Sequence, residues 1–334
     1  MRFEGKMATL AEARPAHAVC GAGRRSAAAA AVLAAACLAL ALAGCGGGDK
    51  PGDSVQDGSD AAAAGGGTQL DTSAQVMEEP DEDTLYALLD EEAAASLIEQ
   101  AKTDPDANWI AAHPAEYGIY GNVAQTRLLE IAARDPLAAP YVREFLDSYP
   151  ADGPDYSAPA LEAGSPSPDV PETRVPHLYQ WDQRWGYVPY GGFVMGTSAC
   201  GPTALTMVYQ AVTGDKSVSP YDMAQRAYEW GYVTERGTGV ELLYGPVDDL
   251  GMTCWEIPAT AEDIVAALRD GHVLIDNVGI GYFSTSGHFL VLTGVTDDGR
   301  IIINDPFSVT RSAQLWDPEL IASETMVVYA YDKA

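Results

Sequence analysis

The spacing of hydrophobic residues changes along this chain and divides it into segments with different expected structures. In residues 1–44, two arginines precede an uncharged, Ala-rich run over residues 27–43, which is short for a membrane-spanning helix. Residues 45–80 consist largely of Gly, Ala, Asp and Ser with few apolar side chains. Such a segment cannot bury enough surface to fold, so we predict a flexible tether.

The next two segments differ in their proline content. Between residues 81 and 150, apolar side chains recur at helical spacing, which predicts a small all-α bundle that packs on, or shields, the following domain. Residues 151–173 hold five prolines among Gly, Ser and Asp, which predicts a linker or a strap along a surface. The helical stripes contain Leu85, Leu88, Leu89, Leu97 and Ile98; Leu128, Leu129 and Ile131; and Tyr141, Val142, Phe145 and Leu146.

Residues 174–334 alternate between helix-like and strand-like runs, and about 160 residues suit one α+β domain. The stretch TSACGPTAL places Cys200 at the beginning of a predicted helix that ends near Gly214, with Thr197 or Ser198 as the cap. The positive end of a helix dipole favours a thiolate, which is the attacking form of cysteine. Taken alone, Cys200 would be interpreted by default as an inert buried residue.

A predicted β-hairpin supplies a histidine and a carboxylate. The run GHFLVLTGV predicts a strand that carries His288, and RIIINDP predicts the returning strand. Pairing across a four-residue turn over residues 296–299 would place His288 opposite Phe307. Asp305 would then lie on the face of His288, within side-chain reach, and Asn304 on the other face. A turn of odd length would reverse this choice, so either residue could orient the imidazole.

Upstream of the cysteine, Gln180 offers a side-chain amide for an oxyanion, beside the backbone N–H of Cys200. In order, Gln180, the CGPT motif, the GHF motif and the NDP motif resemble the C39-like peptidases, a group with the papain-like fold. The resemblance covers about residues 174–333. It implies an α+β fold in which an N-terminal helix carrying the cysteine packs on an antiparallel sheet carrying the histidine and the aspartate.

The resemblance also implies roles for the candidate residues. Cys200 would be the nucleophile, His288 the general base and later the acid, Asp305 the orienting group and Gln180 the oxyanion donor. The implied activity is that of a cysteine peptidase or amide hydrolase that works through a thioester on a peptide or peptide-like substrate. Two alternatives stay open: a catalytically silent binding module for peptides or cell-wall material, and a thiol transpeptidase or amidase.

The residues around Cys45 resemble the lipobox of bacterial lipoproteins. LAGC follows the apolar run, and cleavage before Cys45 would leave a thiol for diacylation. The alternative is an ordinary signal peptide with a chance cysteine. The lipobox predicts a protein held on the extracytoplasmic face of the cell membrane by a lipid at Cys45, and no later run is long and apolar enough to span a bilayer.

The net charge of the chain excludes some classes of binding partner. The chain has 19 Lys and Arg against 48 Asp and Glu, and the first 44 residues hold five of the basic and two of the acidic residues. The remainder therefore has 14 basic and 46 acidic residues, and a formal charge of −32. So acidic a surface repels phosphate groups, and we exclude nucleic acid and anionic lipid headgroups as partners. The oligomeric state is left open.

Two cysteines fall in the segment expected to fold, Cys200 and Cys254, and they could form a disulfide outside the cytoplasm. Cys254 lies in the strand-like run MTCWEI, however, and we interpret it as a packed residue. We interpret His177 as an exposed residue at a strand edge, with a place beside the reacting groups as the alternative. No pair of His or Cys has the spacing of zinc ligands, so we predict neither a metal nor a cofactor.

Overall fold

The structure, a computed structural model, describes residues 77–117, 125–161 and 167–334. All of these belong to one compact unit. The predictions made for residues 1–76, including lipidation of Cys45, lie outside the described residues. Within the described ranges, no helix has the length and apolar character needed to cross a membrane.

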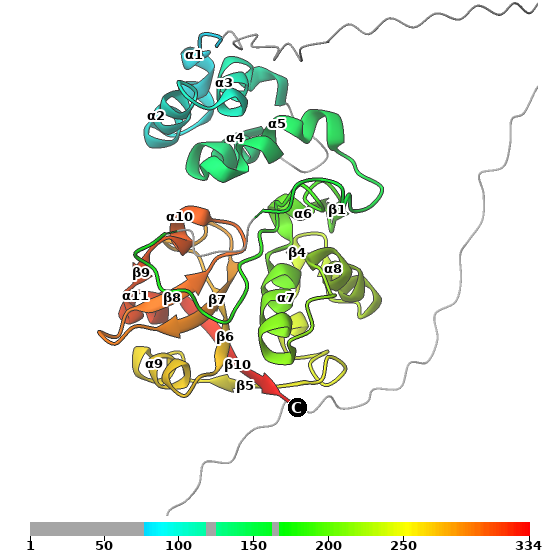
Figure 1. Cartoon of the computed structure of the whole chain (residues 1–334), viewed down its shortest axis with the longest axis vertical. Coiled ribbons are helices and arrows are strands. Elements are labelled where there is room, and N and C mark those ends of the chain that lie inside the picture. The colour runs from blue at the N-terminus through cyan, green and yellow to red at the C-terminus, as the bar shows by residue number, and fades with distance from the viewer. Residues whose placement is uncertain (1–76, 118–124, 162–166) are drawn as a thin grey trace, which may run out of the picture. The chain divides into compact units, whose positions relative to one another are not determined.

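Residues 77–149, which we call the helical segment, form short helices wherever they are described (Figure 1). Three of the helices begin after an aspartate whose side chain accepts a hydrogen bond from the first turn, at Asp81, Asp90 and Asp104. These carboxylates satisfy backbone N–H groups that would otherwise lack an acceptor. The elements are α1 (Glu82–Leu88), α2 (Glu91–Gln100), α3 (Pro105–Ala112), η1 (Pro114–Tyr117), α4 (Gln125–Arg134), η2 (Pro136–Ala138) and α5 (Ala139–Ser148).

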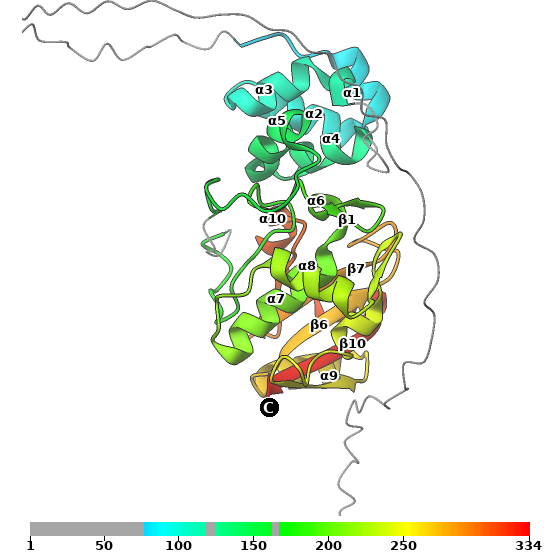
Figure 2. The ribbon, with the colours of Figure 1, turned by 90° about the vertical axis from the view of Figure 1, so that its right-hand side faces the viewer.

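A six-stranded antiparallel sheet forms the centre of residues 167–334, which we call the sheet segment (Figures 1 and 2). The strand order is β5-β10-β6-β7-β8-β9, so the C-terminal strand lies between β5 and β6. This antiparallel sheet confirms the predicted α+β class. The strands are β5 (Met252–Ile257), β6 (Val273–Val278), β7 (His288–Val295), β8 (Ile301–Asn304), β9 (Leu315–Trp316) and β10 (Thr325–Lys333).

Helices cover both faces of the sheet (Figure 1). Val273 and Ile275 of β6 join one core, with the apolar residues of α7. Leu274 and Val278 point to the other face and join the core with α9 and α11, as the alternation of side chains along a strand requires. The helices are α7 (Cys200–Thr213), α8 (Pro220–Glu229), α9 (Ala261–Arg269) and α11 (Pro318–Glu324). The short elements are β1 (Pro189–Tyr190), β2 (Phe193–Val194), α6 (Met195–Ser198), β3 (Val233–Thr234), β4 (Gly237–Thr238), η3 (Val240–Leu243) and α10 (Val309–Ser312).

Helix α7 begins at Cys200 and ends at Gly214, which adopts the left-handed conformation with φ 81° that favours glycine. The predicted cap by Thr197 or Ser198 is wrong. Both residues lie in the preceding turn α6, and their hydroxyls donate to the carbonyl oxygen of Val194 instead. The chain therefore enters α7 from another helical turn, without a side-chain cap.

The β7–β8 hairpin differs from the prediction at its turn. Val295 pairs with Ile301, so the turn has five residues and the predicted four-residue turn is wrong. The register shifts by one residue between Leu292 and Gly294, where Thr293 forms a β-bulge. The bulge cancels the effect of the odd turn, and beyond it Val291 pairs with Asn304. The strand ends near the site are therefore in the register that was expected.

The helical segment and the sheet segment share one hydrophobic core. Tyr141 of α5 is buried in the cluster that also contains Trp181 and Tyr187, and its ring stacks on that of Tyr187 with 4.9 Å between centroids. The Tyr141 hydroxyl donates to the Gly186 carbonyl oxygen at 3.3 Å. A Cβ at Gly196 would collide with that hydroxyl, so the glycine permits this approach. Burying each such ring contributes about 1.5–3 kcal/mol to stability.

The proline-rich connection between the two segments follows the surface of the sheet segment. The backbone N–H of Ala151 donates to the Tyr187 carbonyl oxygen at 3.2 Å, and that of Asp155 donates to the Arg184 carbonyl oxygen at 2.8 Å. Val170, after the gap in the described chain, is buried. These contacts favour the strap over the free linker.

Candidate active site

Cys200 is the first residue of α7, and its thiol is half-buried and forms no disulfide with another described residue. Cys254 is also a free thiol, buried in β5. The alternative of a disulfide between them is therefore wrong. The side chain of Cys200 lies close enough to the ring of His288, which begins strand β7, to raise its pKa.

His288 lies against a buried carboxylate. Its Nε2 atom is 2.7 Å from Oδ1 of Asp305, which follows β8, and Asp305 is fully buried. With Nε2 directed at the carboxylate, Nδ1 is the ring nitrogen left to accept a proton from Cys200. Burial disfavours the imidazolium, but the charge of Asp305 and the hydrogen bonds to Asp305 and Cys200 outweigh it and raise the pKa of His288 to about 9.

Arg311, on α10, binds the other oxygen of Asp305. Its Nε atom lies 2.6 Å from Oδ2, and its Nη1 atom donates to the Phe283 carbonyl oxygen at 3.0 Å. Burial opposes the charge on Asp305, yet Arg311 and His288 together hold the pKa of this carboxyl well below its usual range. The backbone N–H groups of Phe307 and Ser308 also donate to Oδ1. Asp305 is therefore charged, fixed and shared between a ring and a guanidinium.

The sequence pattern does not reveal Arg311. It lies six residues after Asp305 in a four-residue helix, and no hydrophobic periodicity or motif marks it. A basic residue soon after the NDP motif was the only available signal.

Asp305, and not Asn304, faces the imidazole. The Asn304 side chain lies on the opposite side and donates from Nδ2 to the carbonyl oxygens of Val175 and Pro176, at 3.2 Å each. Asn304 therefore fastens the beginning of the sheet segment to β8 rather than orienting His288.

His177 is buried, and its interpretation as an exposed strand-edge residue is wrong. Its Nε2 atom lies 3.0 Å from the Asp305 carbonyl oxygen and 3.2 Å from the Ser312 hydroxyl. Burial lowers the pKa of His177 to about 4, so the ring is neutral at ordinary pH. It holds the backbone of Asp305 from behind, in a position that the sequence pattern did not reveal.

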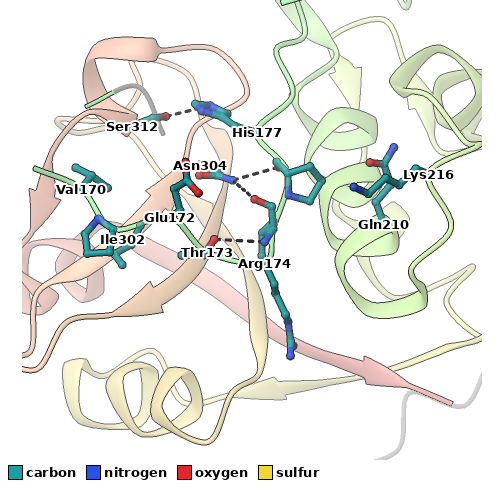
Figure 3. A pocket seen from close by; sticks show the side chains of 13 residues that line it. Val170, Glu172, Thr173, Arg174, His177, Gln210, Lys216, Ile302, Asn304 and Ser312 are labelled. Carbon is teal, nitrogen blue, oxygen red and sulfur yellow. Dashed lines mark hydrogen bonds between the residues drawn. The ribbon is translucent and has the colours of Figure 1, made fainter. Parts of the chain in front are cut away.

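A pocket of about 250 Å³ opens behind these groups, as Figure 3 shows. It contains neither Cys200 nor His288, but His177 and Asn304 lie along its wall. Both of those polar groups are engaged within the protein, as described above. The pocket therefore lies next to the residues that hold Asp305, and Cys200 and His288 lie outside it.

Gln180 is buried beside the loop that precedes Cys200. Its Nε2 atom donates to the Gly196 carbonyl oxygen at 3.1 Å, and its backbone N–H donates to Pro306 at 2.8 Å. One amide hydrogen is left without an acceptor, and Oε1 has no partner among the described residues. Gln180 thus links the loop before Cys200 to the residue after Asp305 and keeps a donor available.

Metal binding receives no support from the described part of the chain. There, no group of three or more His, Cys, Asp or Glu side chains is arranged to hold a metal ion.

Residues 172–333 match the model of the Peptidase_C39 like family. This match confirms the resemblance of the domain to the C39-like peptidases. The similar solved structures include the peptidase domain of Streptococcus ComA, a bi-functional ABC transporter involved in a quorum-sensing pathway. It is 20% identical, with a TM-score of 0.34, and the match covers 41% of this chain and 93% of that one. No curated protein matches the chain. The C39-like domain has the papain-like fold, with the helix of Cys200 packed on the sheet of His288.

Proposed function

We propose that this protein is a cysteine peptidase or related amide hydrolase whose nucleophile is Cys200. The observation that carries the proposal is the row of three contacting side chains, in which the His288 ring lies between the Cys200 thiol and the Asp305 carboxylate. The substrate is a peptide or peptide-like amide.

The raised pKa of His288 favours the imidazolium, so Nδ1 already holds the proton of the Cys200 thiol, and in the first half of the reaction the thiolate attacks the amide carbonyl carbon. The negative charge that forms on the carbonyl oxygen is stabilised by the free Nε2 hydrogen of Gln180 and by the backbone N–H of Cys200. The C–N bond then breaks. His288 gives its proton to the departing amine, and the acyl group remains on Cys200 as a thioester.

In the second half, a water molecule attacks the thioester while Nδ1 of His288 takes its proton. The C–S bond breaks and the acid product leaves. Cys200 is then a thiolate again, and the proton taken from water remains on His288 beside it. Asp305 keeps Nε2 protonated throughout and stabilises the imidazolium, without becoming protonated itself. Arg311 supports this role because it favours the charged form of Asp305.

We also propose that the protein works on the extracytoplasmic face of the cell membrane, held there by a lipid at Cys45. The lipobox-like LAGC and the tether-like composition of residues 45–80 support this location. Mass spectrometry of the membrane fraction tests it: a diacylglycerol adduct at Cys45 is expected, and a Cys45→Ser variant should lose it.

The enzymatic proposal is tested by labelling the full chain with iodoacetamide and mapping the modified cysteine by mass spectrometry. Near neutral pH, Cys200 should react at least tenfold faster in the wild type than in His288→Ala, and Cys254 should react slowly because it is buried. Equal rates in the two proteins would leave a tethered binding module as the better description. Adding a nucleophilic amine then separates transfer from hydrolysis, since only a transferase forms the aminolysis product in preference to the acid.

A further inference from the structure

The helical segment reaches the candidate active site through the loop that follows Asp305. Asp135, between α4 and η2, is buried, and its Oδ1 accepts hydrogen bonds from the Ser308 hydroxyl at 3.2 Å and the Thr310 backbone N–H at 3.0 Å. The Thr310 hydroxyl donates to the Arg134 carbonyl oxygen at 2.8 Å. The C-terminal end of α4 is thereby fixed to α10.

This contact carries Arg127, two turns earlier on α4, to the reacting groups. Its guanidinium carbon lies 4.4 Å from the centre of the Phe307 ring. The Phe307 ring in turn meets the His288 ring edge to face, with 6.3 Å between centroids. The Phe307 ring therefore contacts both the Arg127 guanidinium and the His288 imidazole.

Among the described residues, the ion pair that Arg127 forms is a weak one. Its Nη1 atom lies 3.9 Å from Glu130, one turn away on α4, and both side chains are about two-fifths exposed. An exposed pair at that separation contributes little. Asp305, whose charge acts on Arg127, is already engaged by Arg311 and His288. Arg127 thus presents donors toward solvent beside the site.

The electrostatic environment agrees with this position. Burial lowers the pKa of Arg127, the charges of Glu130, Cys200 and Asp305 raise it, and the positive charge of Arg311 lowers it. Cys200 and Asp305 are therefore both near enough to Arg127 to influence its charge. In a chain with 48 acidic and 19 basic residues, a half-exposed cation at this point is a local exception.

We infer that Arg127 contacts the substrate and selects for a carboxylate close to the reacting carbonyl. A guanidinium binds a carboxylate through two parallel hydrogen bonds, and the group can come from an acidic side chain or from a chain terminus. The inference rests on the proposed function, since it concerns the substrate of the same site. It gives the helical segment a part in recognition.

Two reagents of nearly equal shape test this without knowledge of the substrate. Iodoacetate carries a carboxylate where iodoacetamide carries an amide, and both alkylate Cys200. The rate of Cys200 alkylation by iodoacetate, divided by the rate with iodoacetamide, should fall about fivefold or more in Arg127→Gln. The same ratio should be kept in Arg127→Lys. In Glu130→Gln, the ratio should rise, because the competing carboxylate is gone.

Arg143 offers a matched control. It lies on α5 of the same segment, and its guanidinium carbon is 3.7 Å from the Trp109 ring centre. Arg143→Gln makes the same change in net charge and removes the same kind of contact, and the rate ratio should stay within a factor of about 1.5 of the wild type.

Two pairs of epoxysuccinyl peptides identify the source of the carboxylate. One pair differs by Asp or Asn in a side chain, and the other by a free or an amidated terminus. The pair whose selectivity falls in Arg127→Gln contains the recognised group. If Arg127→Gln slows iodoacetate and iodoacetamide by the same factor, or neither ratio responds, Arg127 merely packs on Phe307 and the inference is wrong. The proposed function fails separately, when the iodoacetamide rate no longer depends on His288.

Discussion

The Nε atom of Arg311 lies 2.6 Å from Oδ2 of Asp305, on the carboxylate edge that His288 leaves free. This contact holds a charged carboxylate in a place from which water is excluded. It makes Arg311 a positioning residue that acts on the thiol through two other side chains.

Replacing Arg311 with Met should therefore reduce the stabilisation of the His288 imidazolium by Asp305, although Arg311 itself does not contact the thiol. Asp305 would lose the cation that favours its charged form, and removal of one partner of a buried ion pair costs about 3–5 kcal/mol of stability. We expect iodoacetamide labelling of Cys200 to slow about tenfold and its pH dependence to shift. Arg311→Lys should recover part of the rate. Arg300→Met, in the exposed hairpin turn, is the control and should match the wild type.

Asp305→Asn and Asn304→Ala should separate orientation from support. The amide at 305 retains the shape but not the charge, so labelling of Cys200 should slow about tenfold or more. Asn304→Ala removes hydrogen bonds to Val175 and Pro176, and we expect a loss of about 1–2 kcal/mol in the free energy of unfolding with little change in the labelling rate. A larger catalytic defect at residue 304 than at residue 305 would contradict the assignment.

The raised pKa of His288 predicts a dependence of stability on pH. Because the folded-state pKa is about 9 and the unfolded value is 6.5, the imidazolium stabilises the fold fully below pH 6.5, and this contribution is lost as the pH rises to 9. The upper bound is about 3 kcal/mol. The difference in thermal unfolding midpoint between the wild type and His288→Gln should therefore shrink between pH 6.5 and pH 9. A constant difference over that range would show that the ring is neutral in the fold.

The bulge at Thr293 predicts different outcomes for two deletions in one hairpin. Deleting Thr293 would pair β7 and β8 without the compensating residue, so His288 would rotate to the opposite face of the sheet. Labelling of Cys200 should then fall to the level of His288→Ala, or the protein should fail to fold. Deleting Asp298 from the exposed turn should be tolerated better. Retention of full activity in the Thr293 deletion would contradict the parity argument.

The agreement between sequence and structure is uneven, and the hairpin explains why. Local patterns predicted the strand of His288, the helix of Cys200 and the antiparallel sheet, because each depends on a few neighbouring residues. The turn length was wrong, and the face of Asp305 was right only because a bulge corrects the register. Nothing in the residue pattern announces Thr293 as that bulge.

The supporting residues could not be predicted from local pattern. His177 and Arg311 lie 128 and six residues from Asp305, and both are recognisable only once the fold brings them to opposite sides of that residue. For the same reason, the helical stripes of residues 81–150 predicted helices but gave no sign of Arg127 beside Phe307. Periodicity reports which side of an element is buried, and it carries no information about what that side meets.

Asp135 and Tyr141 are six residues apart, yet Asp135 grips the loop after Asp305 and Tyr141 grips the loop before Cys200. The short stretch between them thus connects, at a fixed distance, the loop that follows Asp305 and the loop that precedes Cys200. A movement of one loop relative to the other would have to break the contact of the Tyr141 ring or the hydrogen bonds of the Asp135 carboxylate. The spacing between the Cys200 thiol and the His288 ring therefore depends on a stretch of chain that contributes neither of them.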